Sequence, residues 1–274
     1  MSGTLFVLAT PIGNLGDLSP RAADVLRRVP AVAAEDTRQT RKLLDHVGSR
    51  AELVSCHAHS PPERLAELVA RVESGQDLAV CTDAGTPGVS DPGPALVARA
   101  RAAGLSVIPV PGPSAVATVL MASGLPADRF VFLGFPPRKG RDRGVWIERI
   151  KGETLPVVCF EAPGRVGDLL ADLAEACGPD RWALVGREMT KKFEEYRGGS
   201  LGELQAWAAA EVRGEVTLVV AGAAEAPPAV DREGAASLAA ALVDAGVERS
   251  TAARVVAQVH GLRRNESYRL FAED

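Results

Sequence analysis

Residues 78–93 read LAVCTDAGTPGVSDPG, and this stretch decides how the first half of the chain folds. Its first four residues form a short apolar run, which predicts a buried strand. The loop that follows, at 83–93, contains three glycines and two prolines in eleven residues. Glycine lets a backbone approach a ligand closely, and proline holds a loop in one shape. A buried strand that ends in such a loop is typical of the ligand-binding edge of an α/β sheet.

Comparable loops occur at three other expected strand ends. They follow short apolar runs and cover residues 10–14, 35–38 and 111–115. Because ligands bind beyond the carboxyl ends of the strands in open α/β sheets, four such loops favour one shared small-molecule site. The alternative is that each loop is an elaborate turn that binds nothing.

Short apolar runs alternate with amphipathic helical stretches, which predicts mostly parallel α/β architecture. We expect two α/β domains, at 1–118 and 119–224, with a cleft between them, and a small C-terminal helical module at 231–274. A stretch rich in Ala and Pro, 223–230, is the expected linker. The expected strands are 5–9, 31–34, 78–81, 107–110, 130–134, 156–160, 182–187 and 216–221; the expected helices open at Ser19-Pro20 and cover 63–73, 95–103, 166–177, 237–245, 250–260 and 266–271, with Ser250 and Asn265 as N-caps.

Two common nucleotide-binding motifs are missing, since neither GxGxxG nor GxxxxGK[ST] follows the first expected strand. Their absence argues against a dinucleotide site and a P-loop, and it favours a neutral or cationic ligand. The four cysteines form no CxxC pair, so we expect neither a disulfide framework nor a structural zinc site. Without a signal peptide or a membrane-length apolar run, the chain is expected in a reducing cytoplasm and not in a membrane.

The net charge of −4 gives no support to non-specific coating of nucleic acid. However, residues 136–151 and 249–269 each carry a local net charge of +4. Such segments can contact RNA phosphates, although a solvated helix face is the alternative. The candidate RNA-binding residues in them are Arg138, Lys139, Arg141, Arg143, Arg254, Arg263 and Arg264.

Nearly the whole chain carries short motifs in a fixed order. They are LATPIGNL at 8–15, AEDTR at 34–38, TDAGTP at 82–87, SDPG at 90–93, PGPS at 111–114, GLP at 124–126, GFP at 134–136, FE at 160–161, REMTK at 187–191, GE at 214–215 and VHGLRRN at 259–265. Together these motifs resemble the tetrapyrrole methylase superfamily, and more closely its ribosomal RNA branch. Each motif is weak alone, but the combination is specific.

The resemblance implies a methyltransferase that binds S-adenosylmethionine (SAM) between two α/β domains, in most cases as a homodimer. In the ribosomal RNA branch, the implied reaction is 2′-O-methylation of a cytidine in the decoding region of 16S rRNA, within the 30S ribosomal subunit, and it requires no metal. Many superfamily members have Gly-Asp-Pro where this chain has Gly85-Thr86-Pro87. Because the acidic side chain is absent here, the resemblance implies only backbone contacts at this position. The implied cofactor contacts are Pro11, Asp83, Gly85, Thr86, Val89, Ser114, Ala115, Phe160, Glu161 and Val216.

Two charged clusters are candidates for catalysis in this implied reaction. Asp36 could orient the ribose or accept its proton, and Arg38 could hold a phosphate. Glu188 and Lys191 form a second cluster across the expected cleft. The alternative is that these charges only start a helix and form salt bridges. His57 is a further candidate for a substrate contact, because no set of metal ligands accompanies it at a suitable spacing.

Two other interpretations of the function stay open at this point. The first is a small-molecule methylase that acts on a tetrapyrrole such as a precorrin. The second is a non-catalytic, ribosome-binding assembly factor that retains a SAM-binding fold. The basic segments and the motifs of the ribosomal RNA branch count against the first of these.

Overall fold

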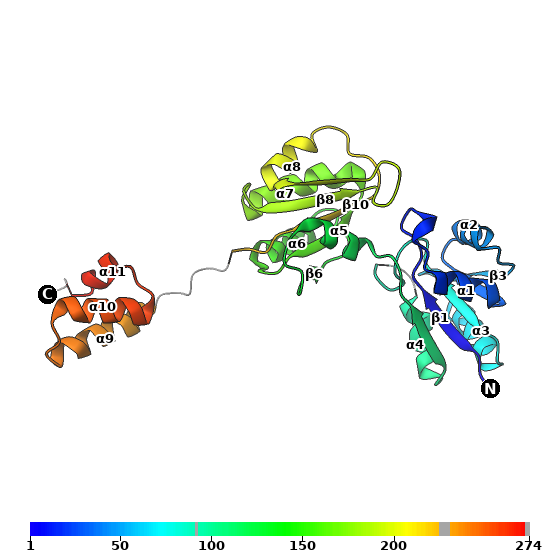
Figure 1. The fold of residues 1–274 in the computed structure, drawn as a ribbon, viewed down its shortest axis with the longest axis horizontal. Coiled ribbons are helices and arrows are strands. Elements are labelled where there is room, and N and C mark those ends of the chain that lie inside the picture. Colours follow the sequence, from blue (N-terminus) through cyan, green and yellow to red (C-terminus); the bar gives the residue numbers. More distant parts are fainter. Residues whose placement is uncertain (91–92, 225–230, 272–274) are drawn as a thin grey trace. The chain divides into compact units, whose positions relative to one another are not determined.

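The computed structural model describes residues 1–90, 93–224 and 231–271 (Figure 1). Residues 1–223 form one compact unit with two five-stranded sheets, and the remaining C-terminal residues form a second unit. Two sheets with helices packed against them, followed by C-terminal helices, confirm the predicted fold class. Most of the predicted linker, 225–230, lies outside the described residues. Among the described helices, none is both long and apolar enough to span a membrane.

The first sheet has five parallel strands in the order β3-β2-β4-β1-β5. The central strands β2 and β4 are buried at every residue because helices cover both faces of the sheet. One face packs against α1 and α2, and the other packs against α3 and α4. The elements of this half are β1 Thr4–Leu8, η1 Leu15–Asp17, α1 Pro20–Arg28, β2 Ala31–Ala34, α2 Thr37–Val47, β3 Glu52–Ser55, α3 Pro62–Glu73, β4 Leu78–Cys81, α4 Pro94–Ala102 and β5 Ser106–Val110.

The second sheet has the order β6-β7-β10-β8-β9, and only β6 and β7 run parallel to each other. The predicted parallel arrangement is therefore wrong for this half, because apolar runs do not report strand direction. One face packs against α6, α7 and α8, and the other packs against α5. The elements are α5 Ala115–Ser123, β6 Val131–Phe132, α6 Arg141–Gly152, β7 Val157–Glu161, η2 Pro163–Arg165, α7 Val166–Cys177, β8 Trp182–Arg187, β9 Glu195–Ser200, α8 Leu201–Trp207 and β10 Val216–Val220.

The C-terminal unit is a bundle of three short helices, α9 (Arg232–Asp244), α10 (Arg249–His260) and α11 (Arg264–Arg269). The predicted N-caps Ser250 and Asn265 are wrong, because both residues lie inside helices. The N-caps lie two residues earlier, at Glu248 and Arg263. The Ser250 hydroxyl donates to the Glu248 carboxylate. Small residues pack the bundle at its centre: Ala235, Ala239, Ala252, Ala253 and Val256.

The prediction missed helix α2, and this matters for the site. The segment after β2 is mostly polar, and only Thr40, Leu43, Leu44 and Val47 are buried, at helical spacing. Residues predicted as a loop at 35–38 are thus partly the first turn of α2. The helices α5, α6 and α8 and the strands β3 and β9 also lacked a predicted counterpart.

One apolar cluster connects the two sheets of residues 1–223. Ile12, in the loop after β1, packs with Val116 and Val119 of α5 and with strand residues of the second sheet. Met189, in the loop after β8, belongs to the same cluster. Because loops from both sheets contribute to it, this cluster sets the distance between their ends and shapes the cavity described next.

Candidate active site

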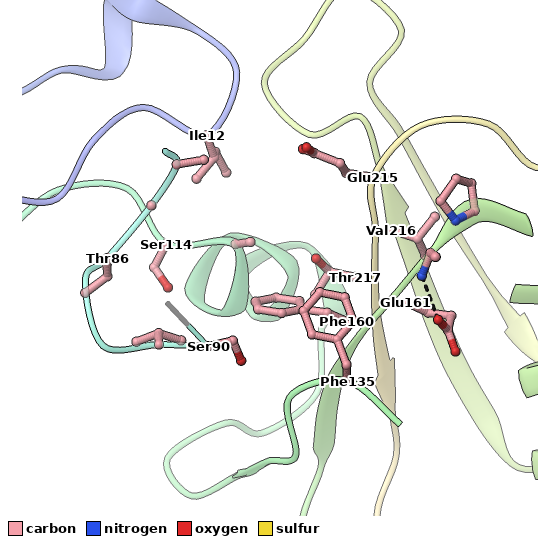
Figure 2. A pocket seen from close by; sticks show the side chains of 16 residues that line it. Ile12, Thr86, Ser90, Ser114, Phe135, Phe160, Glu161, Glu215, Val216 and Thr217 are labelled. Atoms are coloured by element: carbon pink, nitrogen blue, oxygen red, sulfur yellow. Dashed lines mark hydrogen bonds between the residues drawn. The ribbon is translucent and has the colours of Figure 1, made fainter. Parts of the chain in front are cut away.

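A cavity of about 300 Å³ lies between the carboxyl-end loops of the first sheet and the end of the second sheet where β7 ends and β10 begins (Figure 2). Both sheets contribute to its walls, as predicted for the cleft. Its lining is largely apolar, with a few hydroxyl and carboxylate groups. The lining residues are Ile12, Ala84, Gly85, Thr86, Val89, Ser90, Ser114 and Ala115 on one side and Phe135, Phe160, Glu161, Ala162, Pro163, Glu215, Val216 and Thr217 on the other.

Hydrogen bonds join the three loops on the first-sheet side. Thr10 and Gly85 exchange two backbone bonds, from Thr10 N to Gly85 O (2.8 Å) and from Gly85 N to Thr10 O (3.0 Å). The Thr86 hydroxyl donates to the Pro113 carbonyl at 3.0 Å. Gly85 has a φ of +80°, a conformation that favours glycine. The loops after β1, β4 and β5 therefore form one wall that is connected before any ligand binds.

Aromatic rings form part of the opposite wall. The Phe160 ring lies 5.0 Å from the Phe132 ring and 5.4 Å from the Phe135 ring, measured between centroids. Figure 2 shows Phe135 and Phe160 together at this wall. Phe135 is 56% exposed, which is unusual for a large apolar side chain and leaves its ring face accessible. This wall offers flat apolar surfaces to a planar ligand.

Glu161, at the end of β7, is a buried carboxylate in the lining of the cavity. Its side chain is 0% exposed and forms an ion pair with Arg165 of η2. Oε1 accepts bonds from Ala162 N (2.7 Å) and Arg165 Nε (2.8 Å). Oε2 is buried and has no hydrogen-bond partner among the described residues. A ligand with an N–H or O–H group could supply that partner.

Lys191 bridges two glutamates beside the cavity. Its Nζ donates to Glu188 Oε1 (3.0 Å) and to Glu215 Oε2 (2.8 Å), and Glu215 lines the cavity. Burial lowers the pKa of Lys191, but the hydrogen bonds to Glu215 and Glu188 outweigh it, so the pKa lies above its ordinary value. The hydrogen bond from Lys191 also lowers the pKa of Glu188. Both groups are therefore charged at neutral pH.

The backbone that carries this cluster is strained. Glu188 has a φ of +48° and Thr190 a φ of +68°, values that non-glycine residues rarely adopt. Gly214 lies against the cluster, and a Cβ there would overlap the Glu188 side chain. Strained backbone concentrates at functional sites, so the geometry supports a role for this loop beyond packing.

Asp36 and Arg38 form a local fork at the start of α2. Asp36 is the N-cap of the helix and accepts a bond from Arg38 N at 2.8 Å. The Arg38 guanidinium donates to both carboxylate oxygens, at 3.1 and 2.7 Å. These bonds lower the pKa of Asp36 to about 2. The arrangement matches the structural alternative of a helix start with a salt bridge, and a carboxylate with so low a pKa is a weak base.

The cavity brings together eight of the ten predicted cofactor contacts: Gly85, Thr86, Val89, Ser114, Ala115, Phe160, Glu161 and Val216. The other two, Pro11 and Asp83, line a neighbouring cavity of about 200 Å³ instead. Sequence reasoning missed other lining residues that stand beside the motifs it used, among them Ile12, Ser90, Phe135, Glu215 and Thr217. Their positions follow from the loops, but which of them face the cavity is decided by the fold.

The predicted RNA-binding residues fall in different environments. Arg143 is 14% exposed, and its guanidinium is held by Asp172 of α7 and by the Pro137 carbonyl, so in this structure it fastens α6 to α7. Arg138, Lys139 and Arg141 are exposed just before and at the start of α6. Arg254, Arg263 and Arg264 are exposed on the C-terminal unit.

The described residues include no group of three or more His, Cys, Asp or Glu side chains that could hold a metal ion. All four cysteines are free, and Cys81 and Cys159 are buried within strands, as expected for core residues. Burial raises the pKa of Cys81 to about 12, which makes its thiol a poor nucleophile.

The sequence profile described as Tetrapyrrole (Corrin/Porphyrin) Methylases matches residues 4–205. The chain belongs to this family. This confirms the resemblance that the motifs predicted. Among tetrapyrrole methylases, it is 43% identical over 271 residues to the ribosomal RNA small subunit methyltransferase I of Pseudomonas aeruginosa, covering 97% of this chain and 96% of the relative. It is 44% identical over 269 residues to the protein of the same name from Xylella fastidiosa, covering 97% and 98%.

A solved tetrapyrrole methylase shares the fold. The uroporphyrin-III C-methyltransferase from Thermus thermophilus, in complex with S-adenyl homocysteine, superposes with a TM-score of 0.56 at 21% identity. The match covers 80% of this chain and 97% of that protein. The solved methylase therefore supports the architecture of the two sheets. The similarity to the sequence relatives extends further along the chain, because it covers 97% of it and so includes the C-terminal helices.

Proposed function

We propose that this chain is a SAM-dependent methyltransferase that acts on the RNA of the small ribosomal subunit, and that it methylates the ribose 2′-hydroxyl of a cytidine in 16S rRNA. The observation that carries the proposal is the cavity between the two sheets, which is built from the loops that contain the family motifs. Relatives named as ribosomal RNA small subunit methyltransferases, similar over nearly the whole chain, support the RNA substrate.

The residues that line the cavity fit SAM. SAM carries a positive charge on sulfur, and the ionisable residues of the lining are two carboxylates, Glu161 and Glu215. Their cationic partners, Arg165 and Lys191, lie outside the lining. The buried Glu161 Oε2 lacks a partner among the described residues, and the amino and hydroxyl groups of SAM can donate to it. Phe135 and Phe160 offer ring faces to an adenine. The residues proposed to hold SAM are the eight predicted contacts that line this cavity, Gly85, Thr86, Val89, Ser114, Ala115, Phe160, Glu161 and Val216. Pro11 and Asp83 line the neighbouring cavity and are not part of the proposed SAM site.

When bound, SAM would supply an electrophilic methyl group to the ribose 2′-oxygen. The carbon–sulfur bond would break, S-adenosylhomocysteine would leave, and the hydroxyl proton would pass to solvent water. The chain positions the reacting groups, which is worth much of the rate in such a displacement. Lys191 stays protonated at neutral pH, so its proposed role is to stabilise negative charge that develops on the 2′-oxygen. Glu188 and Glu215 hold its ammonium in place. Arg38 is proposed to bind a phosphate of the RNA, and Asp36 to orient Arg38 and the ribose.

The proposed RNA surface has two parts. The first consists of Arg138, Lys139 and Arg141 at the start of α6, and the second of Arg254, Arg263 and Arg264 on the C-terminal unit. Arg143 contributes to the first part indirectly, by holding α6 on α7. We further propose that the chain works in the cytoplasm as a homodimer with domains 1–118, 119–224 and 231–274.

Methyl transfer from labelled SAM to purified 30S subunits, followed by mapping of the modified nucleotide, tests the function. The expected result is one labelled cytidine in 16S rRNA that resists alkaline cleavage. Transfer to a precorrin but not to 30S subunits would establish the tetrapyrrole methylase alternative. Binding of SAM and of 30S subunits without transfer to either substrate would establish the assembly factor.

Replacing Asp36 by asparagine is expected to lower kcat about tenfold and to change the Kd for SAM less than twofold. Asparagine is a good N-cap, so α2 should persist, but the charged fork with Arg38 is lost. Single-turnover methyl transfer and calorimetry measure the two quantities. The control is Asp45→Asn, the same change on an exposed position of α2. A kcat equal to the wild-type value would leave Asp36 with the helix-capping role alone.

Removing residues 231–274 is expected to raise the Kd for 30S subunits roughly tenfold or more and to leave the Kd for SAM unchanged. These residues form a separate compact unit that carries three exposed candidate arginines, whereas the SAM cavity lies wholly within residues 1–223. Filter binding and calorimetry on the truncated protein check this. The full-length variant with Arg254, Arg263 and Arg264 changed to alanine should show the same direction; a loss of SAM affinity in it would contradict the separation of roles.

A further inference from the structure

A third cavity, of about 530 Å³, lies beyond the carboxyl ends of the strands of the first sheet and has no role in the function proposed above. Its walls include Glu35 after β2, Cys56, His57 and Ser60 after β3, and Ser90 in the loop after β4. Ser90 also lines the candidate SAM cavity. The two cavities therefore share a wall at Ser90. Figure 2 shows the Ser90 side chain among those that line the candidate SAM cavity.

His57 presents a hydrogen-bond donor in this third cavity. Its Nδ1 accepts a bond from the backbone N–H of His59 at 3.2 Å, so the proton of the neutral ring is on Nε2. The turn is held further by a bond from His57 N to the Ser60 hydroxyl at 2.8 Å. His57 is exposed, so its Nε2–H can be reached by a ligand.

Glu35 presents an acceptor in the same cavity. Its Oε2 accepts a long bond from Asp83 N, at 3.4 Å, and no bond to Oε1 occurs among the described residues. Burial raises the pKa of Glu35, and the bond from Asp83 N opposes this only in part. The carboxyl group is thus partly desolvated and still has an oxygen to offer to a ligand.

We propose that this third cavity receives the target base of the RNA and reads it as cytosine. We call it the base pocket and define it by Glu35, Cys56, His57, Ser60 and Ser90. The exocyclic amine of cytosine donates to Glu35, and the neighbouring ring nitrogen accepts from His57 Nε2. The ribose then lies at Ser90, beside the SAM cavity. The proposal rests on the proposed function, and it adds the residues that select the nucleotide.

The chemistry of the pocket favours cytosine over uracil. Glutamate accepts from the cytosine amine, and unstacked bases in single-stranded RNA are read by hydrogen bonds to their Watson–Crick edge. Uracil has the same size but carries a carbonyl in place of the amine. In the same position it would place an oxygen against the Glu35 carboxylate, which is unfavourable. A cavity of about 530 Å³ is large enough for one nucleotide.

A binding experiment tests the base pocket without any methyl transfer. The full-length protein, saturated with S-adenosylhomocysteine, is titrated with cytidine or uridine, and the histidine ring signals are followed by NMR. The chain has four histidines, so the spectrum of His57→Phe identifies the His57 signal. We expect cytidine to shift the His57 signal at millimolar concentration and uridine to shift it far less. No shift with cytidine, or an equal shift with uridine, would overturn the proposal even if the protein methylates 30S subunits.

A kinetic experiment tests the selection directly. Glu35→Ala and His57→Phe are expected to lower kcat/KM for 30S subunits roughly 10-fold to 100-fold, with the Kd for SAM within twofold of wild type. Glu35→Gln is expected to narrow the preference for the natural 30S subunit over one with uridine at the target, because an amide can donate to the uracil carbonyl. A merely structural Glu35 would not change that preference.

Matched controls separate these effects from general loss of charge or of fold. Glu73→Gln makes the same change at an exposed position of α3, and His46→Phe at an exposed position of α2. Both should keep wild-type kcat/KM. Wild-type kcat/KM in both Glu35→Ala and His57→Phe would overturn the base pocket. Absence of methyl transfer by the wild-type protein would instead overturn the proposed function, and the cytidine titration would then be the test of the pocket.

Discussion

Replacing Lys191 by methionine is expected to lower kcat for methyl transfer about 100-fold. Methionine keeps the length and apolar character of the side chain but removes the ammonium. Two of its three N–H donors bind Glu188 and Glu215, which leaves the third for a substrate oxygen. The side chain is 28% exposed and lies against the loop after β1, where a Cβ on Gly13 would overlap Lys191 Cγ. Its position therefore joins the motif loops of both sheets.

The loss of Lys191 also leaves two carboxylates close together at the edge of the cavity. Their repulsion adds to the loss of a donor at the reacting oxygen. Lys191→Arg keeps the charge and should restore part of kcat. The matched control is Lys192→Met, which removes the neighbouring, exposed lysine and should change kcat less than threefold.

Single-turnover kinetics with saturating SAM and 30S subunits measure these values, and thermal unfolding confirms that each variant is folded. If Lys191→Met keeps half of the wild-type kcat or more, Lys191 is a structural residue that only holds the loops together. If KM for 30S subunits rises while kcat is unchanged, its role is RNA binding instead of charge stabilisation in the transition state.

Replacing Arg165 by methionine is expected to lower the free energy of unfolding by about 3 kcal/mol. Arg165 is the ion-pair partner of Glu161, whose side chain is 0% exposed. Without the guanidinium, a buried carboxylate keeps only its bond from Ala162 N. Because Arg165 itself is 31% exposed, water can replace part of the pairing, and the loss should lie at the lower end of the range for broken buried pairs.

Urea denaturation at neutral pH measures the change. For a domain of this size, the corresponding decrease in Tm is about 6–12 °C. The double variant Glu161→Gln/Arg165→Met removes both charges and should recover more than half of the loss. Arg149→Met, at an exposed position of α6, is the control and should change stability by less than about 0.5 kcal/mol. A loss below about 1 kcal/mol in Arg165→Met would mean that water solvates Glu161 after all.

Elements with a clear apolar pattern could be predicted from the sequence to the residue. The strands at 31–34, 78–81 and 182–187 and the helix at 166–177 have the predicted bounds. In each of these elements, the composition of the segment agrees with its burial in the structure. The segment is mostly apolar, and polar residues or glycine follow it. Helix α2 was missed because its buried face has only four residues and its exposed face resembles a loop.

The candidate SAM site was largely predictable because its residues belong to continuous motifs at strand ends. Eight of ten predicted contacts line one cavity. The exceptions are instructive: Pro11 and Asp83 belong to the right loops but line the neighbouring cavity, since the direction of a loop side chain depends on backbone turns. Glu215 was named only within a motif, and its bond to Lys191 joins residues 24 positions apart in the chain.

Sequence patterns alone were enough to identify the family, the α/β class, the carboxyl-end loops as the candidate site and the local positive charge of two segments. All of these are written in short stretches of chain, through hydrophobic period, glycine and proline placement and continuous motifs. Three features required the folded structure: the mostly antiparallel direction of the second sheet, the pairing of Arg143 with Asp172, and the wall at Ser90 that the candidate SAM cavity shares with the proposed base pocket. Each of these depends on contacts between residues far apart in the chain, and such contacts are selected by packing of the whole unit rather than by local preference.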